Sequence, residues 1–388
     1  MFRWDSTKPI RLYHPAMKYC FRFICICFLY LLTPFTSAAQ LLNDPATIKM
    51  IQSSLDNIYN YEFDEAEKII AQVEANYPNH PVNYILDSFV LYWKYLPIKD
   101  NAVKSREYIQ LLNECLAAIN KKFGKDSQNP EAVFYTMVAR GYMALLYNYR
   151  GELMNAAGEG KKAYNALTEG LTLINKNSEF YFTAGMYNYY VEIYPEEHPI
   201  IKPVMWFFKK GDKALGLKQI DIATKLGTIT RAESCYYLAR IYLKHEGKPE
   251  KAILYAQKLV DLYPQNVIYR MTQIESLILS GRYDQAIPSI NLLQKKTTGF
   301  FPLAWRTFQG LILEKDEKND VAAQKEYLLA LRTPFDDQYT KEYYAMAYAG
   351  LARIAARAGN KSKAKEYYKK CLEKSEYTTT IQEARTFK

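Results

Sequence analysis

Three short segments hold residue types that could do chemistry. His245-Glu246 begins like a zinc-binding helical motif, but Pro249 stands where the second histidine is needed. Gly158-Glu159-Gly160-Lys161-Lys162 resembles a phosphate loop only in composition, because no Ser or Thr follows the lysine and the segment reads as helix. Glu196-Glu197-His198 could ligate a cation, although a solvated loop explains it more simply. We therefore expect no catalytic residue, no cofactor and no metal site, and predict that the protein is not an enzyme.

Tyrosine is the compositional outlier, with 35 residues in a chain of 388. Aromatic residues are densest between residues 180 and 194, where one helix face cannot bury them all. Exposed tyrosines suit peptide binding or stacking against sugars, whereas tyrosines packed between helices are structural. Tyr187, Tyr190 and Trp206 are the candidates for an aromatic ligand platform, and local packing of these rings is the alternative.

The elements that position these residues follow from an internal repeat. A small residue is followed after four positions by a second residue, mostly apolar, and after three more by a third. The eight sets begin at Ala66, Ser105, Ala163, Gly216, Ala252, Ala286, Ala323 and Ala364. This spacing keeps the three residues on one helix face, and the small first member allows a neighbouring helix to approach closely. Each set therefore predicts the second helix of an antiparallel pair.

The turns between paired helices are also visible. Gly247, Gly281 and Gly359 each precede a helix that carries one of these sets, and glycine there is typical of a left-handed helix end. Pro249 suits the first position of the following helix. The sequence therefore predicts an all-α chain of helix pairs.

The last five sets are separated by 36, 34, 37 and 41 residues. With passages such as Tyr61-Glu62-Phe63-Asp64-Glu65-Ala66 and Gly281-Arg282-Tyr283-Asp284-Gln285-Ala286, the chain resembles the tetratricopeptide repeat family over most of residues 46–376. The resemblance implies a right-handed superhelical solenoid whose concave face is lined by the first helices.

Four regions are expected along the chain. Residues 1–39 read as a signal peptide, 40–227 as irregular repeats with insertions, 228–377 as regular repeats, and 378–388 as a tail or capping helix. Within the irregular part, three prolines between residues 194 and 211 predict an extended loop and not a helix.

The N-terminal segment has the order of a secretory leader. Met17-Lys18-Tyr19-Cys20-Phe21-Arg22 precedes an apolar run from Phe23 to Leu32, and Ser37-Ala38-Ala39 follows. We predict cleavage after Ala39, with Met17 as an alternative start. The apolar run is shorter than the roughly 20 residues of a membrane-spanning helix. We expect an exported protein, periplasmic or associated with the outer membrane, with any membrane contact peripheral.

Charge and cysteine content argue against two further classes. The chain carries a net charge of +10, of which residues 40–388 hold +6 in scattered positions, so nucleic-acid binding is not expected. Cys115, Cys235 and Cys371 have no metal-ligand spacing and lie in apolar helical segments, which predicts buried, unpaired thiols.

The sequence therefore favours a non-enzymatic exported scaffold that binds a peptide or protein partner of the cell envelope in its concave groove. By the resemblance, the groove candidates are Tyr236, Arg240, Glu275, Arg353 and Arg357. Arg353 and Arg357 stand one helical turn apart and could clasp a carboxylate. Binding of a glycan or another small ligand through exposed aromatic rings is the alternative.

Overall fold

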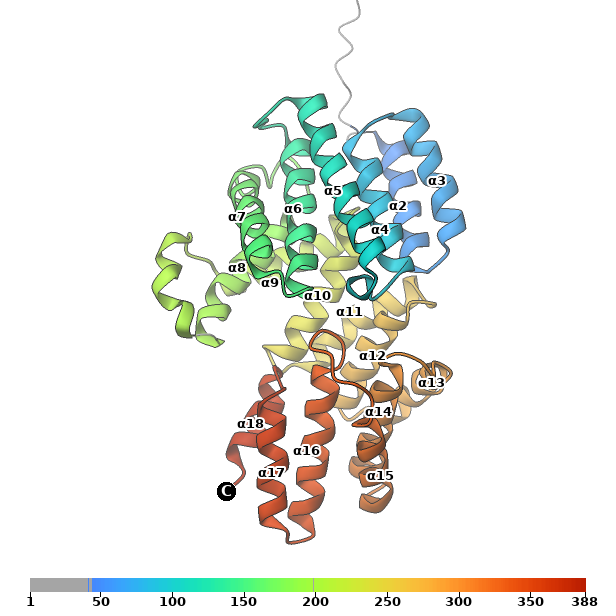
Figure 1. The fold of residues 1–388 in the computed structure, drawn as a ribbon, viewed down its shortest axis with the longest axis vertical. Helices are drawn as coiled ribbons and strands as arrows, with labels where there is room; N and C mark the ends of the chain where they lie inside the picture. The colour runs from blue at the N-terminus through green and yellow to red at the C-terminus, as the bar shows by residue number, and fades with distance from the viewer. Residues whose placement is uncertain (1–40, 42–43, 198) are drawn as a thin grey trace, which may run out of the picture. The chain divides into compact units, whose positions relative to one another are not determined.

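The structure is a computed structural model that describes Leu41 and residues 44–388 apart from His198. The predicted leader, and the histidine of the Glu196-Glu197-His198 segment, lie outside the described residues. The described chain forms seventeen α-helices and no strand (Figure 1). None of these helices is long and apolar enough to span a membrane.

Sixteen of the helices form eight consecutive antiparallel pairs. The pairs are α2 (Pro45–Tyr59) with α3 (Phe63–Asn76), α4 (Pro81–Lys94) with α5 (Ala102–Phe123), α6 (Pro130–Tyr149) with α7 (Leu153–Gly170), α8 (Phe180–Glu197) with α9 (Lys213–Leu226), α10 (Arg231–Lys244) with α11 (Pro249–Leu262), α12 (Val267–Leu279) with α13 (Tyr283–Leu293), α14 (Phe301–Lys315) with α15 (Asp320–Ala330), and α16 (Lys341–Arg357) with α17 (Lys361–Leu372). The last helix, α18 (Thr378–Thr386), packs on α17 and α16. The predicted α-solenoid is confirmed.

The small residues of the repeat lie where the sequence places them. All eight sets fall in the second helix of a pair, and the small residues that begin them are fully buried in the regular repeats, as at Ala252 and Ala286. Gly247, Gly281 and Gly359 adopt the predicted left-handed backbone, with φ of 58°, 72° and 75°. Pro249 is the first residue of α11.

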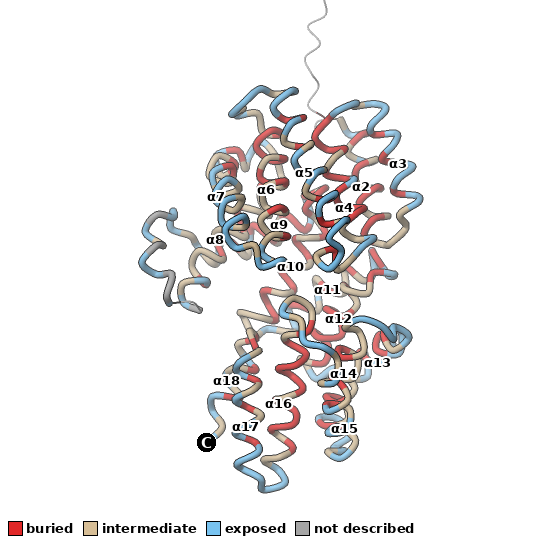
Figure 2. The backbone as a smooth tube through the Cα atoms, in the orientation of Figure 1, coloured by how far each residue is buried: buried red, intermediate tan, exposed pale blue. Residues whose placement is uncertain are grey.

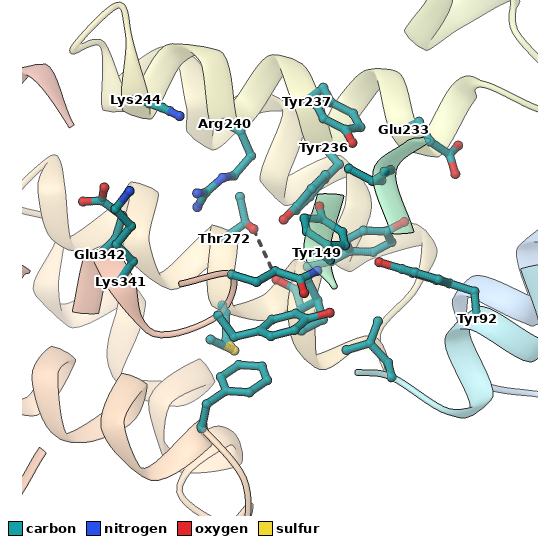
Figure 3. A pocket seen from close by; sticks show the side chains of 18 of the residues that line it. Tyr92, Tyr149, Glu233, Tyr236, Tyr237, Arg240, Lys244, Thr272, Lys341 and Glu342 are labelled. Atoms are coloured by element: carbon teal, nitrogen blue, oxygen red, sulfur yellow. Dashed lines mark hydrogen bonds between the residues drawn. The ribbon is translucent and has the colours of Figure 1, made fainter. Parts of the chain in front are cut away.

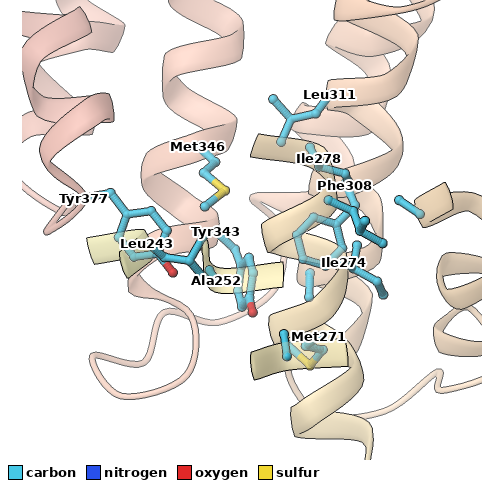
Figure 4. Packing of buried hydrophobic residues seen from close by; sticks show 14 of the residues in the cluster. Leu243, Ala252, Met271, Ile274, Ile278, Phe308, Leu311, Tyr343, Met346 and Tyr377 are labelled. Carbon is cyan, nitrogen blue, oxygen red and sulfur yellow. The ribbon is translucent and has the colours of Figure 1, made fainter. Parts of the chain in front are cut away.

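The main hydrophobic core runs along the second half of the solenoid. Its buried side chains come from the helices α8 to α16 and include Tyr343 of α16 and Tyr377, which directly precedes α18 (Figure 4). Buried backbone follows the faces that pairs turn toward one another, while second helices such as α3 and α17 expose their outer faces (Figure 2). Cys115, Cys235 and Cys371 are buried and unpaired, as predicted, and burial raises the pKa of the Cys235 thiol to about 11.

The expectation of an extended loop between residues 194 and 211 is wrong. Helix α8 continues through Pro195 to Glu197, and residues Pro199–Phe207 form a 3₁₀ helix, η3. Pro195 stands near the end of a long helix whose preceding turns are already formed, and Pro199 begins the next element, where a missing N–H costs no hydrogen bond.

The two halves of the solenoid touch each other directly. Asp56 of α2 accepts hydrogen bonds from Arg231 (2.6 Å) and from the Tyr263 hydroxyl (2.8 Å), and Asn266 donates to the Tyr59 carbonyl (2.8 Å). Lys99 also pairs with Asp336. These partners are 170 to 240 residues apart in the chain, so the first half of the solenoid packs against the second.

Candidate functional site

A cavity of about 360 Å³ lies between these two halves and is lined mainly by first helices. We call it the tyrosine cavity, because ten tyrosines line it: Tyr92, Tyr108, Tyr142, Tyr149, Tyr190, Tyr236, Tyr237, Tyr269, Tyr339 and Tyr343. They come from α4, α5, α6, α8, α10, α12 and α16 and, for Tyr339, from the segment that leads into α16. Ten of the 35 tyrosines therefore share one internal surface.

Helix α10 supplies the polar stripe of the cavity. Glu233, Tyr237, Arg240 and Lys244 are spaced by four, three and four residues, so they follow one face of the helix. The turn before α10 is fixed by buried Glu179, whose carboxylate accepts the backbone N–H groups of residues 228, 229 and 230. Figure 3 shows Glu233 at one end of the stripe and Arg240 and Lys244 at the other.

The cationic end of the cavity is internally paired. Arg240 lies 3.2 Å from Glu275 of α12, and the Tyr377 hydroxyl contacts both side chains at 2.8 and 3.1 Å. Lys244 and Lys341 both pair with Glu376, at 2.5 and 2.9 Å. Glu376 is 40% exposed, so we take this end as the mouth of the cavity.

Glu342, at the same end of the cavity, makes the stability of the folded protein depend on pH. Its carboxylate accepts from the Ser375 hydroxyl (3.2 Å) and from the backbone N–H of Glu376, and burial raises the pKa of Glu342 to about 7. Between the ordinary glutamate pKa of 4.5 and pH 7, the folded protein keeps a proton that the unfolded chain has released. This group's contribution to stability is therefore present below pH 4.5 and is lost as pH rises through 7.

We predict that Glu342→Gln makes the protein less sensitive to pH in this range. The free energy of unfolding of the variant, relative to that of the parent chain, should rise between pH 5 and 7 by up to about 1.4 kcal/mol per pH unit. Urea unfolding followed by circular dichroism at several pH values measures this difference. Parallel profiles for the two proteins would contradict the prediction.

Tyr236, Arg240 and Glu275, three of the five predicted groove residues, line this one cavity. Sequence reasoning missed most of the other tyrosines, because neighbours in the cavity such as Tyr92, Tyr149 and Tyr339 lie far apart in the chain. Their common signal is position, since most lie on the first helix of a pair.

Arg353 and Arg357 require a correction. They do clasp a carboxylate, but it belongs to the chain itself: Arg353 binds Glu314 through two nitrogens, each at 2.7 Å, and Arg357 binds Glu314 at 3.0 Å and Asp320 at 2.6 Å. Arg353 also contacts Glu383 of α18 at 2.9 Å. Arg353 is therefore a packed link between α14, α16 and α18 and not a free groove residue.

The three platform candidates face different surroundings. Tyr190 lines the tyrosine cavity, and Trp206 is an exposed side chain of η3. Tyr187 donates a hydrogen bond to the Lys209 carbonyl (2.5 Å) and lines a second cavity, between α6, α7, α8 and the start of α10. Tyr187 and Tyr190 thus line different cavities. We call this second space the apolar cavity.

The part of the chain that the structure describes holds no group of three His, Cys, Asp or Glu residues that could bind a metal ion. Pro249, which stands in place of the second histidine of the zinc-like motif, is the first residue of α11. Gly158 and Gly160 lie within helix α7, not in a phosphate-binding loop.

Two segments match family models of the tetratricopeptide repeat, residues 233–266 and residues 345–374. The first comprises most of α10 and all of α11, and the second most of α16 and all of α17. These two helix pairs are therefore tetratricopeptide repeats. Repeats of this kind generally act as scaffolds for protein–protein interaction. No curated protein matches the chain.

Two solved structures are similar over most of the chain. A human IFIT1 dimer with PPP-AAAA is 14% identical, with a TM-score of 0.35, and the match covers 85% of this chain and 95% of that one. The C-terminal part of a TPR repeat-containing protein from Cytophaga hutchinsonii is 13% identical, with a TM-score of 0.24, and the match covers 86% of this chain and 98% of that one.

Proposed function

We propose that the protein is a non-enzymatic scaffold of the bacterial cell envelope that binds a short segment of a protein partner in the tyrosine cavity. The observation that carries this proposal is the convergence of Tyr236, Arg240 and Glu275 with nine other tyrosines on one internal surface of first helices. Tyrosine offers a large, rigid contact area with a polar tip, which is why it is common in binding sites for peptides.

The size of the cavity limits what can enter. A volume of about 360 Å³ is at the lower end of the range for small-ligand pockets, roughly 300–1,000 Å³. An α-helix with its side chains is about 10–12 Å wide and would not fit. We therefore expect a partner to insert one or two side chains or a chain end, with the paired charges at Arg240 and Glu376 at the mouth.

Export rests on the sequence of the leader. We propose that the chain is cleaved after Ala39 and acts in the periplasm or at the outer membrane. Mass spectrometry of the mature protein purified with a C-terminal tag tests this directly. A mature chain beginning at Gln40 is the expected result, and retention of residues 17–39 would contradict it.

Site-specific photo-crosslinking tests the binding surface. A benzophenone amino acid replacing Tyr236 should capture one or a few envelope proteins in cells. The same amino acid at Leu254, an exposed position on the outer face of α11, should not. Capture from both positions alike, or from Leu254 alone, would contradict a partner site in the tyrosine cavity.

A glycan is the second candidate ligand, and the same ten rings favour it, since sugars stack on aromatic faces. Glycan binding in the tyrosine cavity does not require that Tyr187, Tyr190 and Trp206 form an aromatic platform. If position 236 captures no protein, calorimetric titration with envelope oligosaccharides decides between the two. Binding that is lost on Tyr236→Ala would support the glycan.

A further inference from the structure

Glu233 lies in the wall between the two cavities and lines both of them. Its Oε1 accepts a hydrogen bond from the Tyr59 hydroxyl, which comes from the first helix of the solenoid. Its Oε2 is buried and has no hydrogen bond of full geometry, although the Tyr142 hydroxyl interacts with the carboxyl group. Among the described residues, no lysine, arginine or histidine forms an ion pair with Glu233. A buried carboxyl oxygen without such a hydrogen bond is costly, so it points to a missing donor.

Two of the other acidic side chains that line the tyrosine cavity contrast with Glu233. Glu275 is paired with Arg240, and Glu376 is paired with Lys244 and Lys341. All of these cations lie toward the mouth, at the opposite end of the α10 stripe (Figure 3). The Glu233 end therefore has a carboxyl group and no countercharge.

Aromatic rings surround this carboxyl group. Tyr142 and Tyr237 line both cavities, as Glu233 does. The faces of tyrosine rings attract cations, and an ammonium group among such rings gains most when water is excluded. A carboxyl oxygen that accepts a hydrogen bond, together with the faces of tyrosine rings, suits an ammonium group.

The apolar cavity continues directly from this point. It has a volume of about 430 Å³, and its lining is almost entirely apolar, with Met137, Leu145, Leu167 and Met186 as examples. The two threonine hydroxyls in the lining are already used: Thr183 donates to the Phe180 carbonyl and Thr230 to Glu179. Apart from the hydroxyl groups of the lining tyrosines, Glu233 is thus the polar side chain that remains available to a ligand there.

Small residues create the apolar cavity. A Cβ atom built on Gly141 of α6 or Gly160 of α7 would meet no atom within 4 Å. At the neighbouring crossing of α8 and α9, by contrast, a Cβ on Gly185 or Gly216 would meet backbone atoms at 2.8 and 2.7 Å. Glycine inside a helix lowers the stability of the helix by up to about 1 kcal/mol relative to alanine. At Gly141 and Gly160 no close helix contact offsets this loss.

We propose that the apolar cavity and Glu233 form one binding site for a small amphiphilic amine. The ammonium group lies against the Glu233 carboxyl group, between Tyr142 and Tyr237, and the hydrocarbon chain fills the apolar cavity. This site is separate from the cationic mouth at Arg240, so it stands whether or not a partner segment binds there.

Isothermal titration calorimetry with three probes of equal chain length tests the site. Octylammonium, octan-1-ol and octanoate differ only in the head group. We expect octylammonium to bind most tightly and octanoate most weakly. Glu233→Gln should weaken octylammonium binding about tenfold or more, the size of a hydrogen bond to a charged group, and leave octanol binding unchanged. The side-chain amide oxygen of the Glu233→Gln variant can still accept the hydrogen bond from the Tyr59 hydroxyl.

A second variant tests the chain-binding half of the site. Gly160→Leu should fill the apolar cavity and abolish binding of both octylammonium and octanol. Gly158→Leu is its matched control, because Gly158 lies on the same helix, is exposed and lines neither cavity. Circular dichroism confirms that each variant folds.

Three results would each overturn the proposal. The first is octanoate or octanol binding as tightly as octylammonium. The second is unchanged octylammonium binding in either Glu233→Gln or Gly160→Leu. The third is no octylammonium binding at millimolar concentration.

Discussion

Replacing Arg353 with methionine should destabilise the protein by about 3 kcal/mol or more, because it leaves a buried carboxylate without its main partner. Glu314 is 1% exposed, and Arg353 contacts it through two hydrogen bonds of 2.7 Å. Hydrogen bonds and the nearby positive charge hold the pKa of Glu314 below its ordinary value. Methionine keeps the length of the side chain but removes the charge and every donor.

The neighbouring arginine provides the control. Arg357 contacts the same carboxylate but is 47% exposed, so Arg357→Gln should cost about 1 kcal/mol or less. Adding Glu314→Gln to Arg353→Met should restore part of the loss, because the buried charge is then removed as well. Urea unfolding followed by circular dichroism measures all three variants. Equal losses for Arg353→Met and Arg357→Gln would show that burial does not set the strength of this pair.

Gly216→Ala should destabilise the protein by about 1–3 kcal/mol through overpacking. A Cβ at this position would lie 2.7 Å from the Tyr189 nitrogen and 2.8 Å from the Gly185 carbonyl oxygen. Both are backbone atoms of α8, so no side chain can move aside, and α8 and α9 must separate. The thermal unfolding midpoint of the variant should therefore fall.

Gly160→Ala is the matched comparison and should have the opposite sign. Its Cβ meets nothing within 4 Å, so the higher helix propensity of alanine should stabilise α7 by up to about 1 kcal/mol. A lower midpoint for both variants would indicate that the space beside Gly160 is not open in solution.

The repeat was predictable because it is local. Ala252, Ala256 and Leu259 lie on one face of a single helix, and the left-handed turn at Gly247 depends on one residue's freedom at positive φ. The family resemblance named Tyr236, Arg240 and Glu275 of the first helices as groove candidates, and all three line the tyrosine cavity.

Predictions based on single residues failed where the answer depends on partners distant in the chain. The spacing of Arg353 and Arg357 indicated a carboxylate clasp, but nothing local shows that Glu314, 39 residues earlier, is the carboxylate. Similarly, the prolines between residues 194 and 211 favoured a loop, because each removes a backbone donor. The structure places them where α8 is ending and η3 is beginning.

The sequence by itself determined the all-α class, the helix pairing and the faces that pack, because these follow from spacings of three, four and about 34 residues. Only the tertiary structure decided that Asp56 reaches Arg231 and that Lys99 reaches Asp336, which joins the two halves of the solenoid beside the tyrosine cavity. It also decided that the Glu233 carboxyl group stands between two cavities without a countercharge. The physical reason is that each small rotation between neighbouring repeats leaves local packing nearly unchanged, whereas their sum over several repeats determines which distant side chains meet.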